Sequence, residues 1–139
     1  MGEERRARRL VKAVDTNIVA RALTQDDPVQ SPIADRILAA GAFIPLTVLL
    51  ETGWLLRSRY GFPRAAIVDM LSTLCELPNV TVDEEDGVRW ALAQYAVAGD
   101  IADLIHLVSA RRSSGFVTFD AGVARAAGPG TPMPIETLA

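Results

Sequence analysis

Two hydrophobic patterns alternate along this chain. Short apolar runs, typical of buried strands, occur between longer segments whose apolar residues recur at helical spacing. The runs predict strands at residues 10–14, 42–45, 80–82, 115–119 and 133–135. The spaced segments predict helices at residues 18–23, 32–40, 48–59, 63–77, 84–98, 101–112 and 121–127.

Cap and turn residues mark the boundaries of these elements. Ser31 precedes Pro32, a pair typical of an N-cap and a first helical residue, and Thr47 is predicted to cap the next helix. Gly41 and Gly61 are expected to end helices. Strands that alternate with helices form parallel sheets covered on both faces. The sequence therefore predicts an α/β fold whose ligands bind beyond the carboxyl ends of the strands.

Length and composition indicate a single domain, at residues 10–139. A chain of 139 residues, half of them apolar, suffices for one core. The single cysteine, Cys75, excludes an internal disulfide and a cysteine-rich zinc site. The arginine-rich residues 1–9 precede no apolar run of secretory length, and no stretch reaches the ~18 apolar residues of a membrane span. We therefore expect a cytoplasmic protein with no membrane partner.

The charge balance does not favour a general nucleic-acid binder. Fourteen basic and seventeen acidic side chains give a formal charge of −3, whereas nucleic-acid-binding surfaces are usually basic. If RNA binds, a few local arginines must contact its phosphates, although surface solubility explains most arginines equally well. The candidates are Arg21, Arg57, Arg59, Arg111 and Arg112.

Two aspartates directly follow predicted strands. Asp15 follows the strand at residues 10–14, and Asp120 follows the strand at residues 115–119. Both are therefore expected at the end of the sheet where ligands bind. Either carboxylate could instead serve only as the N-cap of the next helix.

Glu51 stands out because its neighbours in residues 46–56 are almost all apolar. A carboxylate in apolar surroundings is costly unless it is paired, hydrogen-bonded or bound to a metal. We expect Glu51 in the first turn of its helix, where the positive end of the helix dipole offers a purely structural explanation.

Asp100 and Asp103 lie three residues apart at the start of a predicted helix, on the face opposite its apolar stripe. Asp100 is well placed to be the N-cap, so Asp103 is the stronger functional candidate. Carboxylates that converge without lysine or arginine repel one another and have raised pKa values. A hard cation such as Mg²⁺ or Mn²⁺ resolves this repulsion and can activate water for attack on a phosphate.

The order and spacing of these acidic motifs resemble those of the PIN-domain ribonucleases. The motifs are Val14-Asp15-Thr16-Asn17-Ile18, Glu51 in its apolar helix, Asp100-Ile101-Ala102-Asp103-Leu104-Ile105-His106 and Thr118-Phe119-Asp120. The short length and the Asp-Thr-Asn opening look most like the VapC toxins of toxin–antitoxin pairs. The resemblance covers residues 10–138, and each motif is weak alone.

The resemblance implies a three-layer α/β/α sandwich around a parallel β-sheet and a Mg²⁺- or Mn²⁺-dependent endoribonuclease. It also implies a homodimer neutralised by a VapB-like antitoxin. Asp100 is a further candidate metal ligand, and Asn17 and Thr118 match polar positions that support such a site. By position, the catalytic, metal-binding carboxylates would be Asp15, Glu51, Asp103 and Asp120.

One departure from the resemblance is the basic extension at residues 1–9, because relatives often begin almost at the first strand. The extension is either an RNA-contacting arm or a disordered tail.

Other readings of these residues stay open. The chain could be a catalytically silent PIN-like module that binds RNA or protein. A phosphatase with Asp15 as nucleophile would want a second acid nearby, which Asn17 cannot provide. His106 could approach the site, but the resemblance implies a metal-bound water in place of a histidine base. Trp54 and Trp90 could stack on bases, but their apolar helical patterns favour the core or a dimer interface.

Overall fold

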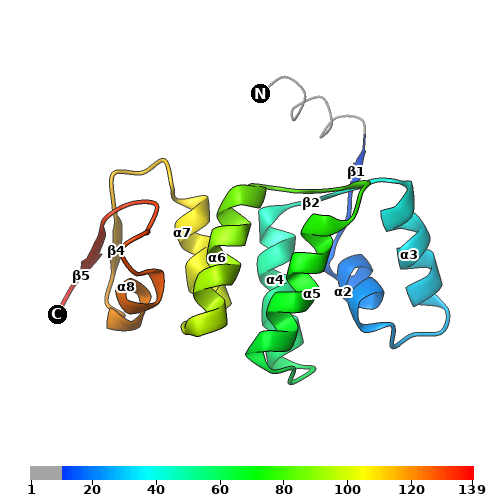
Figure 1. The fold of residues 1–139 in the computed structure, drawn as a ribbon, viewed down its shortest axis with the longest axis horizontal. Coiled ribbons are helices and arrows are strands. Elements are labelled where there is room, and N and C mark those ends of the chain that lie inside the picture. Colours follow the sequence, from blue (N-terminus) through cyan, green and yellow to red (C-terminus); the bar gives the residue numbers. More distant parts are fainter. Residues whose placement is uncertain (1–10) are drawn as a thin grey trace.

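The computed structural model describes residues 11–139 (Figure 1). Its strands are β1 (Lys12–Ala13), β2 (Ala42–Ile44), β3 (Val80–Val82), β4 (Phe116–Thr118) and β5 (Ile135–Thr137). Its helices are α2 (Thr16–Thr24), α3 (Gln30–Ala40), α4 (Leu46–Ser58), α5 (Arg64–Glu76), α6 (Glu85–Val97), α7 (Ile101–Ser109) and α8 (Ala121–Ala127). The predicted basic extension at residues 1–9 lies outside the described residues.

The strands pair in parallel, as predicted, but they form two sheets where we expected one. β1, β2 and β3 make a sheet with β2 in the centre, where Ala42 lies opposite Lys12 and Val80. β4 pairs with β5 beside α8, at the other end of the molecule (Figure 1). β1 is an edge strand of the first sheet and has only two residues. A further strand paired with it would form few hydrogen bonds and would gain little free energy. The last strand occupies residues 135–137, two positions later than predicted.

The described strands and helices are those of an α/β fold, consistent with the predicted three-layer α/β/α architecture. The core lies between α4, α5, α6 and α7 and reaches the central strand β2. Each large aliphatic side chain buried there stabilises the fold by roughly 1.5–3 kcal/mol. The largest fully buried side chains include Ile44, Leu49, Leu56, Ile67, Leu71, Leu74, Leu104, Ile105 and Leu107.

Close packing of α4 on α7 brings together two of the predicted site segments. Gly53 of α4 faces Ile101 of α7, and a Cβ atom at Gly53 would lie 3.2 Å from the nearest Ile101 methyl carbon. The small residue therefore permits the close approach of the two helices. Glu51 and Asp103 each lie two residues from this contact, on neighbouring helices.

Two predicted helix caps are wrong. α3 begins at Gln30, and the Asp27 carboxylate accepts the backbone N–H groups of Val29 and Gln30 at 2.9 and 2.7 Å. Ser31 is buried, and its hydroxyl donates to a backbone carbonyl of α2. α4 begins directly after Pro45, so Thr47 lies inside the helix and caps nothing. In both cases an earlier turn residue sets the helix start.

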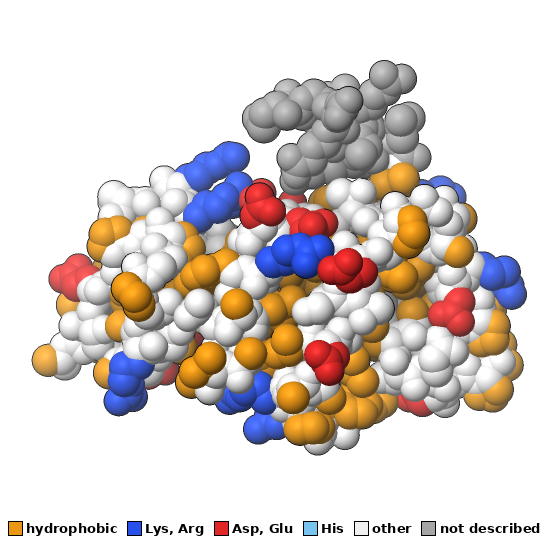
Figure 2. Space-filling model, in the orientation of Figure 1, with side chains coloured by type: hydrophobic (Ala, Val, Ile, Leu, Met, Phe, Trp, Pro, Cys, Tyr) orange, Lys and Arg blue, Asp and Glu red, His pale blue; other side chains and the backbone are white. Residues whose placement is uncertain are grey.

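The surface carries charges of both signs. Figure 2 shows acidic and basic side chains interspersed on the face that α5 and α6 present, with apolar side chains between them. Arg89 of α6 forms ion pairs with Glu76 at 3.2 Å and Glu85 at 3.1 Å. Within residues 11–139, no helix is both long and apolar enough to cross a bilayer.

Candidate functional site

Asp15 and Glu51 line one cavity of about 590 Å³. Asp15 lies two residues after the end of β1 and caps α2, where its Oδ1 accepts the backbone N–H of Ile18 at 3.2 Å. Glu51 accepts a hydrogen bond from the hydroxyl of Thr16, the first residue of α2. The two carboxylates, here called the first acidic group, are thus held beside each other by the start of α2.

The surroundings of Glu51 differ from the sequence expectation. α4 begins at Leu46, so Glu51 lies in its second turn and not in its first. Its side chain is exposed, because Leu49, Thr52 and Gly53 occupy the buried face of the helix. The apolar sequence around Glu51 therefore covers the core, and Glu51 faces the cavity.

Asp100, Asp103 and Asp120 form a second acidic group. Asp103 is half-buried, and its pKa is raised by that burial and then by the charges of Asp100 and Asp120. The neighbouring charge of His106 acts in the opposite direction. Asp100 caps α7 as predicted, because its Oδ1 accepts the backbone N–H groups of Ala102 at 2.7 Å and Asp103 at 3.3 Å.

Asp120 follows a strand of the second sheet, whereas the sequence predicted one sheet whose strand ends would bring the acids together. It follows β4 and caps α8, with its Oδ1 accepting the N–H of Gly122 at 2.8 Å. The Thr118 hydroxyl accepts the backbone N–H of Asp120 at 3.0 Å. Since β4 belongs to the second sheet, α8 brings Asp120 to Asp103 by packing on α6 and α7.

Three of the acidic positions share one local design. Asp15, Asp100 and Asp120 each cap a helix with a carboxylate oxygen. The positive ends of these three helices partly offset the repulsion between the acids, and each cap fixes the orientation of its carboxylate. Each cap uses the Oδ1 atom of its aspartate, so capping does not exclude a functional role for these residues.

A sequence model of the PIN domain matches residues 12–129, a range that includes all five acidic positions. This chain belongs to the PIN-domain family. PIN domains are typically nucleases that use divalent metal ions, and the family suggests RNA as a ligand. In the comparison with curated proteins, no sequence matches the chain.

The acidic residues of this PIN domain fit a metal in chemistry but are not gathered into one cluster. All five are carboxylates, and oxygen ligands suit Mg²⁺ and Mn²⁺. Within residues 11–139, however, no three or more histidine, cysteine or acidic side chains lie together in a way that could hold an ion. The structure therefore divides the predicted ligands between the first acidic group, at the start of α2 and on α4, and the second, at the starts of α7 and α8.

Two of the five candidate arginines lie beside the first acidic group. Arg59 lines the same cavity as Asp15 and Glu51, and Arg21 lines an adjoining one. Arg21 also forms an ion pair with Asp26 at 3.1 Å. The other three line neither cavity. Arg57 donates to the Phe62 carbonyl, and Arg111 forms an ion pair with Glu84.

Sequence reasoning missed two residues of this PIN-domain site. The Asp-Thr-Asn motif includes Thr16, but only the structure shows its hydroxyl on Glu51. Trp54 was predicted in the core or a dimer interface; with 53% of it exposed it is not a core residue, and it lines the cavity of the first acidic group. Trp90 is half-buried in α6. The sequence signal that could have placed Trp54 near Glu51 is their three-residue spacing, which puts both on one face of a helix. Arg59 follows five residues after Trp54.

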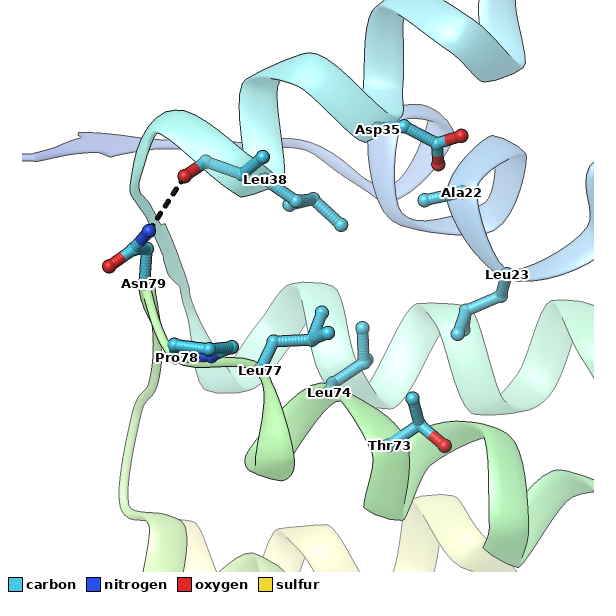
Figure 3. Close-up of a pocket in the computed structure, with 10 residues that line it drawn as sticks. Ala22, Leu23, Asp35, Leu38, Thr73, Leu74, Leu77, Pro78 and Asn79 are labelled. Carbon is cyan, nitrogen blue, oxygen red and sulfur yellow. Dashed lines mark hydrogen bonds between the residues drawn. The ribbon is translucent and has the colours of Figure 1, made fainter.

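A separate pocket of about 370 Å³ between α2, α3 and α5 does not belong to the acidic groups (Figure 3). Leu23, Leu38 and Leu74 supply much of its apolar lining. Asn79 closes one end, where its Nδ2 donates to the Ala39 carbonyl at 2.8 Å. None of the predicted site carboxylates lines this pocket, so it is separate from the candidate site.

Proposed function

We propose that this PIN domain is a metal-dependent endoribonuclease that hydrolyses RNA phosphodiester bonds. The observation that carries the proposal is that one acid of each group, Glu51 on α4 and Asp103 on α7, lies two residues from the contact of these helices at Gly53 and Ile101. RNA and a divalent ion would bind where these helices meet. The proposed catalytic carboxylates are Asp15, Glu51, Asp103 and Asp120, with Asp100 as a further metal ligand.

Each acid has a role that its contacts support. Bound Mg²⁺ or Mn²⁺ would supply an activated water and neutralise charge that develops on the phosphate. Glu51 is oriented by Thr16, and Asp15 by its cap on α2. Burial and the charges of Asp100 and Asp120 raise the pKa of Asp103, so this carboxylate accepts a proton more readily than an ordinary aspartate. We expect products with 5′-phosphate and 3′-hydroxyl ends.

We further propose that the chain is the toxin of a toxin–antitoxin pair, active in the cytoplasm as a homodimer and neutralised by a VapB-like antitoxin. The exposed carboxylates of Asp15, Asp100 and Asp120 support this, because a basic antitoxin segment would be complementary to them. Co-purification of the native protein with a small basic partner would be the expected result. Release of ribonuclease activity on removal of that partner would complete the test.

Cleavage of total RNA by the purified chain tests the nuclease proposal. We expect cleavage with Mn²⁺, none after addition of a chelator, and a loss of at least about 100-fold in the Asp103→Asn variant. Asp35→Asn is a matched control, because Asp35 is an exposed acid outside both acidic groups. Cleavage that survives the chelator or the Asp103 substitution would refute metal-dependent hydrolysis.

A catalytically silent binding module is the second candidate function. The separation of the carboxylates into two groups within residues 11–139 favours it, because no cluster of three is preformed there. RNA binding without cleavage under any metal condition would establish this function. Cleavage that depends on both Mn²⁺ and Asp103 would exclude it.

A further inference from the structure

Trp54 is an exposed aromatic side chain beside the first acidic group. It lies on α4, three residues after Glu51, so that the two side chains follow each other on one face of the helix. Both line the cavity of about 590 Å³ that also contains Asp15. More than half of Trp54 is exposed, although an indole of this size usually buries most of its surface. The exposed ring is therefore available to a ligand in the cavity.

Arg59 provides a free cation in the same cavity. It follows the last residue of α4 and lines the cavity together with Trp54 and Leu55. Within residues 11–139 its guanidinium makes no hydrogen bond or ion pair. Arg21, by contrast, is already engaged by Asp26 and Gln30. Arg59 can therefore contact a phosphate without breaking an existing contact.

Asn17 lies where three cavities adjoin. It lines the cavity of Trp54, a second one with Arg21 and Gln30, and a third with Arg59 and Tyr60. The exposed amide of Asn17 offers both donors and an acceptor, as needed for the polar edge of a base. The three cavities share Asn17, and Arg21 or Arg59 lines each of them.

We propose that Trp54, Arg59 and Asn17 form a binding subsite for one unpaired nucleotide of the substrate, next to the acidic groups. The inference rests on the proposed nuclease function. Trp54 stacks on the base, Arg59 binds a neighbouring phosphate, and Asn17 contacts the base edge. A base inside a duplex is already stacked and cannot lie on a side-chain ring. The substrate class is therefore single-stranded RNA or a loop.

The setting of Trp54 favours RNA over a second copy of the chain. Glu51 and Arg59 lie on either side of Trp54 along the helix, and an interface between two copies would have to remove both charges from water. A bound nucleotide does not have this cost, because its phosphate pairs with Arg59 while Glu51 remains in the acidic group. The mixture of aromatic, cationic and amide side chains is typical of single-strand binding.

Tryptophan fluorescence tests the subsite in the presence of a chelator, so that no RNA is cleaved. The Trp90→Phe variant has Trp54 as its only tryptophan, and Trp54→Phe has only Trp90, which lies on α6. We expect single-stranded RNA to quench Trp54 emission and to leave Trp90 emission unchanged. A duplex of the same sequence should quench neither. Unchanged Trp54 emission at saturating single-stranded RNA would overturn the proposal.

Affinity measurements distinguish the contribution of base stacking on Trp54 from that of phosphate binding by Arg59. Trp54→Ala is expected to weaken binding of single-stranded RNA by about 5- to 150-fold, and Trp54→Phe by much less, because a phenyl ring still stacks. Arg59→Gln should lower the slope of log affinity against log salt by about one phosphate contact. Equal affinity of the Trp54→Ala protein would overturn the proposal. Trp54 emission that changes with protein concentration alone would show a second copy there, and would also overturn it.

Failure of this inference can be distinguished from failure of the nuclease proposal. If the chain cleaves RNA with Mn²⁺ but Trp54→Ala binds normally, the subsite is wrong and the nuclease function stands. If Trp54 responds to single-stranded RNA but nothing is cleaved, the subsite stands and the protein is a binding module.

Discussion

The Thr16 hydroxyl donates a hydrogen bond to the Glu51 carboxylate, across 35 positions of sequence. Thr16 is buried, with 9% of its surface exposed, so its side chain has little freedom to leave this geometry. The contact joins the first turn of α2 to the second turn of α4. It therefore holds Glu51 beside Asp15, the residue that caps α2.

Removal of this hydroxyl should impair the site more than the fold. We expect Thr16→Val to lower RNA cleavage and Mn²⁺ affinity by about 10- to 100-fold, because Glu51 loses its orienting donor. Thr16→Ser retains the hydroxyl and should restore most of the activity. Isothermal titration with Mn²⁺ and single-turnover cleavage provide the two measurements. Equal activity of the valine and serine variants would show that Thr16 does not position Glu51.

The pKa of Asp103 is expected to fall when a neighbouring acidic charge is removed. Burial and the charges of Asp100 and Asp120 disfavour the ionised form, so Asp103 deprotonates at higher pH than an ordinary aspartate. Asp100→Asn removes one charge while the asparagine still caps α7. The pKa of Asp103 should therefore fall, as measured by carbon-detected NMR titration of the carboxyl group without metal. A pKa that does not move would show that Asp100 and Asp103 are not coupled.

The packing of α8 depends on a glycine. Gly99 has φ +94°, and a Cβ atom there would lie 2.4 Å from the Ala126 Cβ atom. Gly61 has φ +68° but nothing within 4 Å of its Cβ position, so it is a control for backbone strain alone. We expect Gly61→Ala to cost about 1 kcal/mol of unfolding free energy. Gly99→Ala should cost roughly 1–3 kcal/mol more, through overpacking against Ala126. Urea unfolding measures both, and equal losses would contradict this packing.

The network around Asp26 predicts an acid-dependent loss of stability. The pKa of Asp26 is lowered from 3.8 to about 2, because the Thr24 and Tyr60 hydroxyls and the Arg21 guanidinium donate to its carboxylate. Its folded pKa is below its unfolded pKa, so the folded state binds fewer protons and gains stability as pH rises between them. That stability is fully present above about pH 3.8 and is lost as pH falls through about 2.

Tyr60→Phe tests the Asp26 network because it removes one donor and keeps the ring. The pKa of Asp26 should rise toward its ordinary value, and less stability should be lost on acidification. NMR titration of Asp26 and urea unfolding at several acidic pH values give the two measurements. An unchanged Asp26 pKa in the Tyr60→Phe protein would contradict the role of the Tyr60 hydroxyl.

Elements with strong local signals were predicted closely. The strand Val80–Val82 and the helix Ala121–Ala127 have the bounds that the apolar pattern indicated. The division into two sheets could not be read from the sequence, because strand pairing depends on contacts between distant segments and β1 is only two residues long. The start of α3 was misplaced because Asp27 caps through a turn that precedes Ser31–Pro32.

For the candidate site, the sequence predicted the surroundings of Glu51 and Trp54 only in part. Glu51 was singled out by apolar neighbours, yet those neighbours face the core and Glu51 is exposed. Trp54 was assigned to the core or a dimer interface by the same pattern; its exposure excludes the core, and it lines the cavity. Helical periodicity shows which residues share a face, but the neighbouring elements decide which face is covered. The family match supports the acidic motifs, and their catalytic roles remain predictions.

A double-variant cycle between Glu51→Gln and Asp103→Asn tests most directly whether the two acidic groups act as one site. The two residues belong to separate groups in the structure, on helices that touch through Gly53 and Ile101. Single-turnover RNA cleavage with saturating Mn²⁺ is measured for both single variants and the double variant. If both acids serve one site, the double variant should be about as slow as the slower single variant, because residues that act as a unit are strongly non-additive. Losses that multiply, or cleavage by the double variant at the rate of the unsubstituted protein, would contradict the account.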